Sequence, residues 1–490
     1  MKLMIATETA VRKVQFYVNG NWEAGAGRGL HPITNPATGQ VIAQVPYATC
    51  ADVDRTAQAA HAAFLKWREV PVVERVQVFY RYKDLLEKHS GEVARILSAE
   101  NGKTIDDARG SVRRGIQMVE VACGMPSLMM GQALENVAQG IDCQAIRQPL
   151  GVCAGITPFN FPAMVPMWMF PFAIACGNTF ILKPSEKVPM TPTRTAELLQ
   201  DAGLPPGVYN LLHGSREPVD ALLAHPLVRA ISFVGSSPVA KHVYQTAAAY
   251  GKRVQALGGA KNHLVVMPDA NIEKSVEAIM GSAFGAAGER CLAGSVLVAV
   301  GEARPLLDAL LQKVRELRLG DGADTATEMG PLVTAEHRQR VLGFIEKGVA
   351  EGAKILVDGR ERMNIHQDGY FLGPTVFDDV APGMTIAREE IFGPVLSVIR
   401  VKDLDEAISL VNRAAFGNTT SIFTSDGKNA REYASRIEVG MVGVNVGVAA
   451  PMAFFPFSGW KSSFFGDLHA HGRDAIAFYT EQKVIMSRWF

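Results

Sequence analysis

The sequence predicts an α/β fold, because short apolar runs alternate along the chain with segments of helical periodicity. Each run is almost entirely apolar, which is typical of parallel strands that are buried on both faces. The runs cover Val152–Ile156, Thr179–Leu182, Val208–Leu212, Ala230–Val234, Leu264–Met267, Val296–Val300 and Leu396–Val401. A length of 490 residues allows two or three domains of ordinary size.

Helical segments lie between these runs. Apolar residues spaced by four and three positions predict one helix. They are Val53, Ala57, Ala60, Phe64 and Trp67. A second helix is predicted over 193–202, after Pro192 and before Gly203. The long apolar stretch 161–182 contains several prolines, so we predict a kinked, buried helix followed by a strand and no membrane span.

Two segments stand apart from this alternation. Residues 478–489 partly alternate with the period of two that is typical of strands, and we predict that they form a small outlying sheet with residues 131–148. Strands at the edge of a domain commonly pair with another subunit. A second alternating block of helices and strands begins near Gly258.

Composition excludes several classes of partner. Lys and Arg (49) balance Asp and Glu (49), so no bulk charge attracts nucleic acid or an anionic membrane. The six cysteines form no C-x-x-C pair, which fits reduced thiols better than disulfides. The first residues show no signal-peptide pattern. We therefore expect a cytoplasmic protein.

One cysteine lies in an unusual stretch, Phe284-Gly-Ala-Ala-Gly-Glu-Arg-Cys291, whose small residues allow close backbone approach. The thiolate is the nucleophilic form of cysteine, and an unperturbed thiol is only ~10% ionised near pH ~7.5. The neighbouring cation Arg290 is expected to raise that fraction. From this stretch alone, Cys291 can be either a catalytic nucleophile or a buried structural residue.

Three more segments carry polar residues at the ends of predicted strands. The asparagine of Thr157-Pro-Phe-Asn-Phe-Pro162 is a fixed amide donor that can stabilise an oxyanion. The lysine and glutamate of Phe180-Ile-Leu-Lys-Pro-Ser-Glu186 can hold ribose hydroxyls. The segment Ile231-Ser-Phe-Val-Gly-Ser-Ser237 leads into a helix whose first N–H groups can bind phosphate. Each signal is weak alone, and the G-x-G-x-x-G of a standard Rossmann domain is absent.

Together, in this order and spacing, these segments resemble the aldehyde dehydrogenase superfamily over about residues 15–490, as do Leu257-Gly-Gly-Ala-Lys261 and Glu389-Glu-Ile-Phe-Gly-Pro394. The resemblance implies a Rossmann-type NAD-binding domain of residues 1–130 and 149–257. It also implies an α/β catalytic domain of residues 258–445 and a small oligomerisation sheet from residues 131–148 and 466–490. A homodimer or homotetramer is expected on the same ground.

The resemblance also implies roles for individual residues. Cys291 is the expected nucleophile, the Asn160 side chain is the expected oxyanion donor, and NAD is the expected cofactor. The expected cofactor-binding residues are Thr157, Phe159, Lys183, Glu186, Lys187, Ser236, Gly258, Glu390 and Phe392. Glu186 is expected to favour NAD over NADP, because it would repel a 2′-phosphate. His469 and His471 belong to no metal-binding pattern, so no metal site is expected.

At one position the chain departs from the hydrolytic members of this superfamily. Those members carry Glu-Leu-Gly-Gly, whose glutamate activates water, and Ala256 occupies the glutamate position here. Alanine accepts no proton, so attack by water loses a general-base contribution of typically ~10²–10⁴-fold. A thiolate is already charged and needs less help, so a thiol acceptor such as coenzyme A is expected. Glu289 is an alternative base, although a structural role is expected for it.

In this departure the chain is similar to the CoA-acylating methylmalonate-semialdehyde dehydrogenases. It also resembles them in residues 126–131, 161–183 and 450–466. The resemblance implies two arginines for the substrate carboxylate, matching Arg114 and Arg290. Arginine suits this task, because its planar fork can bind a carboxylate through two parallel hydrogen bonds. Arg113 competes with Arg114, because consecutive residues face different sides of a helix.

We therefore expect NAD-dependent, CoA-acylating oxidation of methylmalonate semialdehyde or malonate semialdehyde. The products would be propionyl-CoA or acetyl-CoA and CO₂, formed through a thioester on Cys291. One alternative is a hydrolytic aldehyde dehydrogenase that yields the free acid. Another is an inactive scaffold or binding protein with the same fold, although the intact Cys291, Asn160, Lys183 and Glu390 argue against it.

Overall fold

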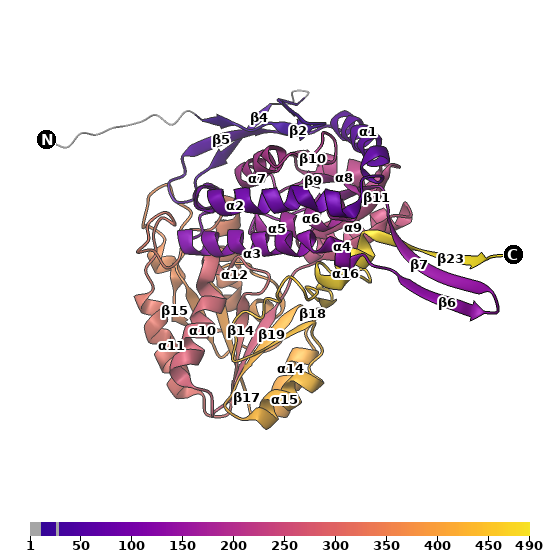
Figure 1. Ribbon diagram of the computed structural model, residues 1–490. Coiled ribbons are helices and arrows are strands. Elements are labelled where there is room, and N and C mark those ends of the chain that lie inside the picture. The colour runs from indigo at the N-terminus through magenta and orange to yellow at the C-terminus, as the bar shows by residue number, and fades with distance from the viewer. Residues whose placement is uncertain (1–10, 26–28) are drawn as a thin grey trace.

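The computed structural model describes residues 11–25 and 29–490 and is built around two large sheets (Figure 1). The first sheet has eight strands in the order β22-β12-β11-β8-β9-β10-β2-β3, and its five central strands are parallel. Its strands are β22 (Phe464–Phe465), β12 (Arg253–Leu257), β11 (Val228–Val234), β8 (Val152–Ile156), β9 (Thr179–Lys183), β10 (Tyr209–Leu211), β2 (Phe16–Val18) and β3 (Asn21–Glu23).

The chain order of this sheet reverses beside β8. From β8 the chain continues through β9 and β10 on one side, and it then returns to β11 and β12 on the other. Ligands of open α/β sheets bind at such a switch point, outside the carboxyl ends of the strands. The ends of β8 and β11 therefore mark this edge as a binding site.

Helices cover both faces of the first sheet and bury separate apolar cores. The helices on one face are α2 (Val72–Asn101), α3 (Ile105–Cys123), α4 (Met125–Leu128), α5 (Met164–Met167), α6 (Phe170–Ala175) and α7 (Met190–Asp201). Those on the other face are α1 (Cys50–Trp67), α8 (Arg216–Ala224) and α9 (Ser237–Ala249). The prediction of a kinked, buried segment before β9 is confirmed, since α5 and α6 are short, separate and buried. Within the described residues, no helix is long and apolar enough to cross a membrane.

The second sheet has seven strands in the order β15-β16-β17-β14-β13-β19-β20, all parallel except the β15–β16 pair. Its strands are β15 (Lys354–Val357), β16 (Thr375–Asp378), β17 (Val395–Val401), β14 (Gly294–Val300), β13 (Asn262–Val266), β19 (Thr419–Phe423) and β20 (Met441–Val444). The helices of this half include α10 (Ile272–Phe284), α11 (Arg304–Glu316), α12 (Ala335–Ala350), α13 (Thr385–Arg388), α14 (Leu404–Asn412) and α15 (Gly427–Arg436). Both sheets confirm the α/β class, and every apolar run predicted to be a strand overlaps one.

The predicted start of one helix is wrong. Helix α7 begins at Met190, so Pro192 lies inside its first turn and does not precede it. The buried carboxylate of Glu100 accepts hydrogen bonds from the backbone N–H groups of Met190 (2.7 Å) and Thr191 (2.8 Å). These contacts satisfy the first N–H groups of the helix. Proline is tolerated in the first turn, because a backbone N–H at that position would make no hydrogen bond within the helix.

A third, three-stranded sheet extends away from the body of the molecule (Figure 1). It consists of β6 (Gln132–Ala138), β7 (Ile141–Pro149) and β23 (Thr480–Arg488), which confirms the two outlying segments as strands. Only part of the range 466–490 belongs to it. Residues Gly472–Phe478 form helix α16, whose apolar side is buried in the core beside the first sheet. Apart from these strands, the assignment of residue ranges to domains stays a prediction.

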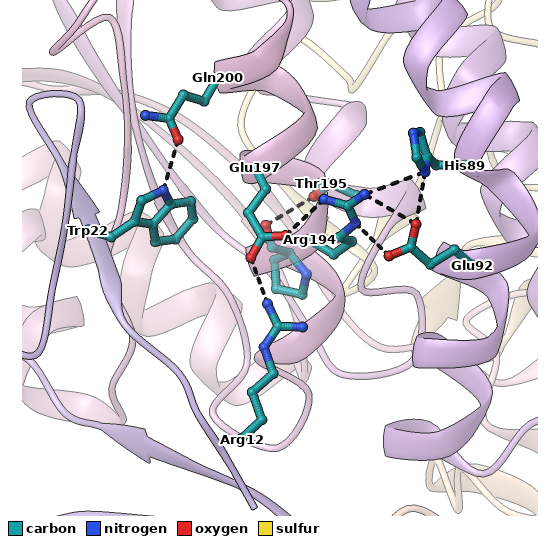
Figure 2. Close-up of polar contacts among 9 residues, drawn as sticks. Arg12, Trp22, His89, Glu92, Arg194, Thr195, Glu197 and Gln200 are labelled. Atoms are coloured by element: carbon teal, nitrogen blue, oxygen red, sulfur yellow. Dashed lines mark hydrogen bonds and ion pairs between the residues drawn. The ribbon is translucent and has the colours of Figure 1, made fainter. Parts of the chain in front are cut away.

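The N-terminal strands are attached to this framework by ion pairs. A small sheet joins β1 (Arg12–Lys13), β5 (Val41–Pro46) and β4 (Leu30–Thr34). Figure 2 shows Arg12 paired with Glu197 of α7 at 2.6 Å, and Arg194 placed between Glu197 and Glu92 at 2.9 Å from each. The network thus links the first strand of the described chain to α7 and α2.

Candidate active site

Cys291 lies in a tightly held turn between the two sheets. The preceding 3₁₀ segment Gly285–Gly288 contains Ala286 and Ala287 with φ of 48° and 52°, a left-handed conformation that alanine rarely adopts. A Cβ atom on Gly288 would lie 2.3 Å from the carbonyl oxygen of Gly393, so glycine is required there. The Cys291 carbonyl accepts hydrogen bonds from the side-chain amides of Asn262 (2.8 Å) and Asn418 (2.9 Å). The closely packed turn before Cys291 and the two hydrogen bonds to its carbonyl therefore fix the position of its backbone.

Two cavities meet at Cys291. The first has a volume of ≈ 250 Å³, and its lining includes Lys103, Asp107, Arg114, Trp168, Arg290 and His471. The second has a volume of ≈ 560 Å³, and its lining includes Phe159, Asn160, Ser236, Gly258, Glu390 and Phe392. Cys291 is therefore the residue that connects the two cavities.

Burial governs the acidity of the Cys291 thiol. Burial, and secondarily the carboxylate of Glu390, raise its pKa to about 12. Arg290 and the backbone N–H groups of Cys291 and Leu292 act in the opposite direction, but they do not outweigh burial. The expected direction of the Arg290 effect is confirmed, but burial outweighs it, and the sequence did not reveal how deeply the sulfur lies.

This pKa predicts a steep pH dependence of alkylation. With the protein free of ligands, the rate constant for reaction of Cys291 with iodoacetamide is expected to rise about tenfold per pH unit between pH ~7 and ~9, because the thiolate fraction grows tenfold per unit below the pKa. The measurement is peptide mass spectrometry of Cys291 over time at each pH. A rate that levels off near pH ~7 would show that the thiol is already ionised.

Asn160 lies at the carboxyl end of β8 and is almost fully buried. One hydrogen of its side-chain amide is donated to the carbonyl of Glu289 at 3.0 Å. An amide nitrogen carries two hydrogens, so the second hydrogen remains for a ligand beside Cys291 in the second cavity. The backbone carbonyl of Asn160 accepts a hydrogen bond from the buried ammonium of Lys103, a contact that the sequence did not reveal.

The expected ribose-binding pair follows the neighbouring strand β9. The Lys183 ammonium donates to the carbonyl of Gly214 at 2.9 Å and lies 3.6 Å from the carboxylate of Glu186, and burial lowers its pKa. The Thr157 N–H donates to the Lys183 carbonyl at 3.1 Å, which joins the ends of β8 and β9. Within the described residues, the buried Thr157 hydroxyl has no hydrogen-bond partner. Lys187 lies 4.9 Å above the ring of Phe159. The switch point thus presents several polar groups that can bind a nucleotide.

The start of α9 forms another wall of the second cavity. Ser236 is exposed at the N-cap, and Gly235, Ser236, Ser237 and Pro238 line the cavity, so the N-terminus of α9 lies at its wall. A Cβ on Gly258 would lie 2.7 Å from the Ser237 hydroxyl, so only glycine lets the two segments approach. The helix start and its close contact with Gly258 fit the pyrophosphate of a dinucleotide.

Glu390 and Phe392 complete this cavity from the second sheet. The Glu390 carboxylate accepts the N–H of Ala260 at 2.8 Å, and burial raises its pKa to about 7. Phe392 has a φ of 59° and contacts Phe159 edge to face at 5.7 Å between ring centres. Its carbonyl accepts a hydrogen bond from Nε2 of His337 at 2.6 Å. The donor set, the helix start and the two aromatic rings together fit NAD.

Glu289 lines neither of the two cavities, so the structure does not favour it as a base. Its carboxyl accepts the N–H of Val333 at 3.2 Å and lies 3.5 Å from Nε2 of His337, and burial raises its pKa to about 8. Its carbonyl meanwhile holds the Asn160 amide, so the residue shapes the site through its backbone. Ala256 is fully buried in β12, beside Phe233 of β11 and Phe465 of β22 in the register of the sheet.

The two predicted substrate arginines lie on the wall of the first cavity. Arg114 of α3 donates to the carbonyls of Ala450 and Pro451 at 3.0 Å each, and among the described residues no ion pair joins it to a carboxylate. Arg113 is exposed and pairs with Glu87 at 3.2 Å, so the structure favours Arg114 over its neighbour. Arg290 pairs with Asp107, which the sequence did not reveal as a site residue. His471, also missed, donates from Nδ1 to the carbonyl of Phe455 at 2.7 Å.

Cys291 lies between the two sheets and lines both a cavity with two arginines and a cavity suited to a dinucleotide. This arrangement is typical of an oxidoreductase that uses a cysteine nucleophile. Residues 22–485 match the aldehyde dehydrogenase family, and the chain belongs to that family of oxidoreductases. The chain is 52% identical, over 99% of its length and 100% of the relative, to malonate-semialdehyde dehydrogenase 1 of Geobacillus kaustophilus (strain HTA426).

Solved structures agree with this relationship. The crystal structure of methylmalonate-semialdehyde dehydrogenase from Oceanimonas doudoroffii superposes with a TM-score of 0.96 at 47% identity, covering 98% of this chain and 99% of that one. A protein of Sinorhizobium meliloti 1021, provisionally described as a methylmalonate-semialdehyde dehydrogenase and solved with NAD, gives a TM-score of 0.96 at 48% identity over 98% and 99% of the two chains.

Proposed function

We propose that the protein catalyses the NAD-dependent, CoA-acylating oxidation of malonate semialdehyde or methylmalonate semialdehyde. The observation that carries this proposal is the first cavity, which Arg114 and Cys291 both line. Its Arg114 guanidinium binds two backbone carbonyls and pairs with no carboxylate of the described residues. A substrate that carries a carboxylate near its aldehyde would supply the missing anion. The names of the relatives point to the same substrates.

The first half-reaction uses the groups around Cys291. The sulfur, as thiolate, attacks the aldehyde carbon, and the carbonyl oxygen becomes an anion that accepts the free N–H of the Asn160 amide. Phe159, Ser236, Gly258, Glu390 and Phe392 line the second cavity and would hold NAD there. Thr157, Lys183, Glu186 and Lys187, at the ends of β8 and β9, would hold the part of NAD that extends beyond this lining. When bound, NAD accepts the hydride that the aldehyde carbon loses. A thioester on Cys291 then carries the oxidised acyl group.

The second half-reaction releases this acyl group. A malonyl-type thioester loses its carboxylate as CO₂, because the electron pair of the breaking bond is delocalised onto the thioester oxygen as an enolate. The Asn160 N–H can stabilise that oxygen as it did the first oxyanion. After protonation at carbon, the thiolate of coenzyme A attacks the thioester and the Cys291 thiolate leaves. Thiolysis needs no water-activating base, which agrees with Ala256 and with the orientation of Glu289.

Replacing Arg114 with leucine tests the substrate class. The kcat/KM for malonate semialdehyde is expected to fall by ~10²–10³-fold, because a buried, hydrogen-bonded carboxylate would lose its cation. The kcat/KM for propanal, which has no carboxylate, is expected to change by less than about threefold. NADH absorbance with both substrates gives both numbers.

Arg113→Leu is the matched control, since Arg113 is the next residue of α3, is exposed and pairs with Glu87. Its kcat/KM is expected to stay within about threefold of the wild type, as is usual for an exposed ion pair. Equal losses for both aldehydes in Arg114→Leu, or a wild-type enzyme that does not prefer the semialdehydes to propanal, would contradict the proposed substrate class.

The proposal extends to location and assembly. A cytoplasmic enzyme agrees with its free cysteines. A homodimer or homotetramer agrees with the sheet of β6, β7 and β23, which extends away from the body of the molecule (Figure 1). Strand β23 lies at its edge and exposes Val484 and Met486. Apolar residues on a strand at a sheet edge are typical of a contact with another chain.

A further inference from the structure

The carboxylate of Asp107 makes two contacts with the segment that carries the nucleophile. One oxygen forms an ion pair with Nη2 of Arg290, and the other accepts the backbone N–H of Ala286 at 3.0 Å. Asp107 itself lies in the first turn of α3, where its own N–H is capped by the hydroxyl of Thr104 at 3.2 Å. The positive end of the helix dipole favours a charged carboxylate at this place.

Arg290 is held on other sides as well. Its Nη1 donates to the carbonyl of Gly281 at 3.1 Å. A Cβ on Gly285 would lie 2.6–2.7 Å from the guanidinium atoms, so the guanidinium rests directly on the Gly285 backbone. Only a glycine at this position leaves room for it. The side chain of Arg290 thus has one defined placement on the wall of the first cavity.

Helix α3 organises both cations of this cavity. Asp107 and Arg114 are seven residues apart, which places them on the same face of the helix two turns from one another. Arg114, Arg290 and Asp107 all line the cavity, and Asp107 also holds Arg290 through an ion pair. Helix α3 therefore positions Arg114 directly and Arg290 through Asp107.

We propose that Asp107 is a positioning residue for substrate selectivity, which orients Arg290 so that Arg290 and Arg114 together bind the carboxylate of the substrate. This inference rests on the proposed function, because it requires a substrate with a carboxylate. A purely structural role for Asp107 would support the strained turn at Ala286 and Ala287, and would affect every aldehyde equally. A positioning role affects only the carboxylated one.

Asp107→Asn separates these two roles. Asparagine keeps an oxygen that can accept the Ala286 N–H, so the turn before Cys291 remains anchored, but it removes the negative charge that pairs with Arg290. The selectivity ratio, kcat/KM for malonate semialdehyde divided by kcat/KM for propanal, is expected to fall roughly tenfold, within the range of measured couplings between directly contacting residues. The melting temperature shows that the variant is folded.

Two further variants complete the experiment. In an Arg290→Leu background, Asp107→Asn is expected to change the selectivity ratio by less than about twofold, because its effect runs through Arg290. Asp405→Asn is the matched control: it makes the same change of charge in the first turn of another helix, α14, at a carboxylate that pairs with Arg436 at 2.6 Å and whose side chain is 75% exposed. Its ratio is expected to stay within about twofold of the wild type, since solvent screens exposed charges.

The outcomes are distinguishable. An equal fall for both aldehydes in Asp107→Asn, an unchanged ratio, or an equal effect with and without Arg290 would overturn the positioning role while leaving the proposed function intact. A wild-type enzyme without a preference for malonate semialdehyde over propanal would overturn the proposed function, and the positioning role with it.

Discussion

Replacing Cys291 with alanine is expected to lower kcat for NADH formation by more than ~10³-fold, because no other nucleophile of the described residues lines both cavities. The measurement is the steady-state rate at saturating aldehyde and NAD. Mass spectrometry of the wild-type enzyme incubated without coenzyme A is expected to show an acyl adduct on the peptide that contains Cys291.

Cys50→Ala serves as the control for this variant. Cys50 is an exposed cysteine in the first turn of α1, on the far side of the first sheet from α3, and its loss is expected to leave kcat within about twofold. Substantial activity in Cys291→Ala, or an acyl adduct on a different cysteine, would contradict the covalent mechanism.

Replacing Asn160 with alanine is expected to lower kcat by ~10²–10³-fold, which is the usual cost of losing one oxyanion donor. The physical reason is the free amide hydrogen, which is held in place by the bond from the same nitrogen to the Glu289 carbonyl and by Lys103 behind the backbone. The loss is expected in kcat more than in KM, because the oxyanion forms only as the reaction proceeds.

Alkylation of Cys291 by iodoacetamide provides the control for Asn160→Ala. The alkylation rate is expected to stay within about threefold of the wild type, which would show that the cysteine and its surroundings are intact. A kcat near that of the wild type would contradict the role of Asn160, and a collapse of both alkylation and folding would show that the residue is mainly structural.

The strands and the core of the site could be predicted because their signals are local. A parallel strand with helices on both faces must be apolar along its whole length, so β8 at Val152–Ile156 is visible as a short apolar run. Asn160 and Lys183 follow directly after such runs, and the topology of the sheet then brings them to one edge.

The remaining features depend on contacts between distant parts of the chain. Helix α7 begins early because of Glu100, which lies 90 residues before Met190. Asp107 and Arg290 are 183 residues apart, and no local pattern connects them. Burial of the sulfur, which decides the pKa of Cys291, is likewise set only when the two sheets pack together.

Helix α16 shows the same limitation at the C-terminus. Residues 466–490 were predicted to be strands of the outlying sheet, yet Ala475, Ile476 and Phe478 are buried against the first sheet's core. These residues form a short helix because their apolar positions face that core, and only β23 continues outward. A short apolar segment does not by itself distinguish a helix from a strand.

The most direct test of the proposed function is NADH production from malonate semialdehyde with and without coenzyme A, followed by mass analysis of the products. Turnover that depends on coenzyme A and yields acetyl-CoA and CO₂ is the expected result, with a single turnover or a very slow rate in its absence. Multiple turnovers without coenzyme A that yield the free acid would contradict the account, because they would require a water-activating base despite Ala256.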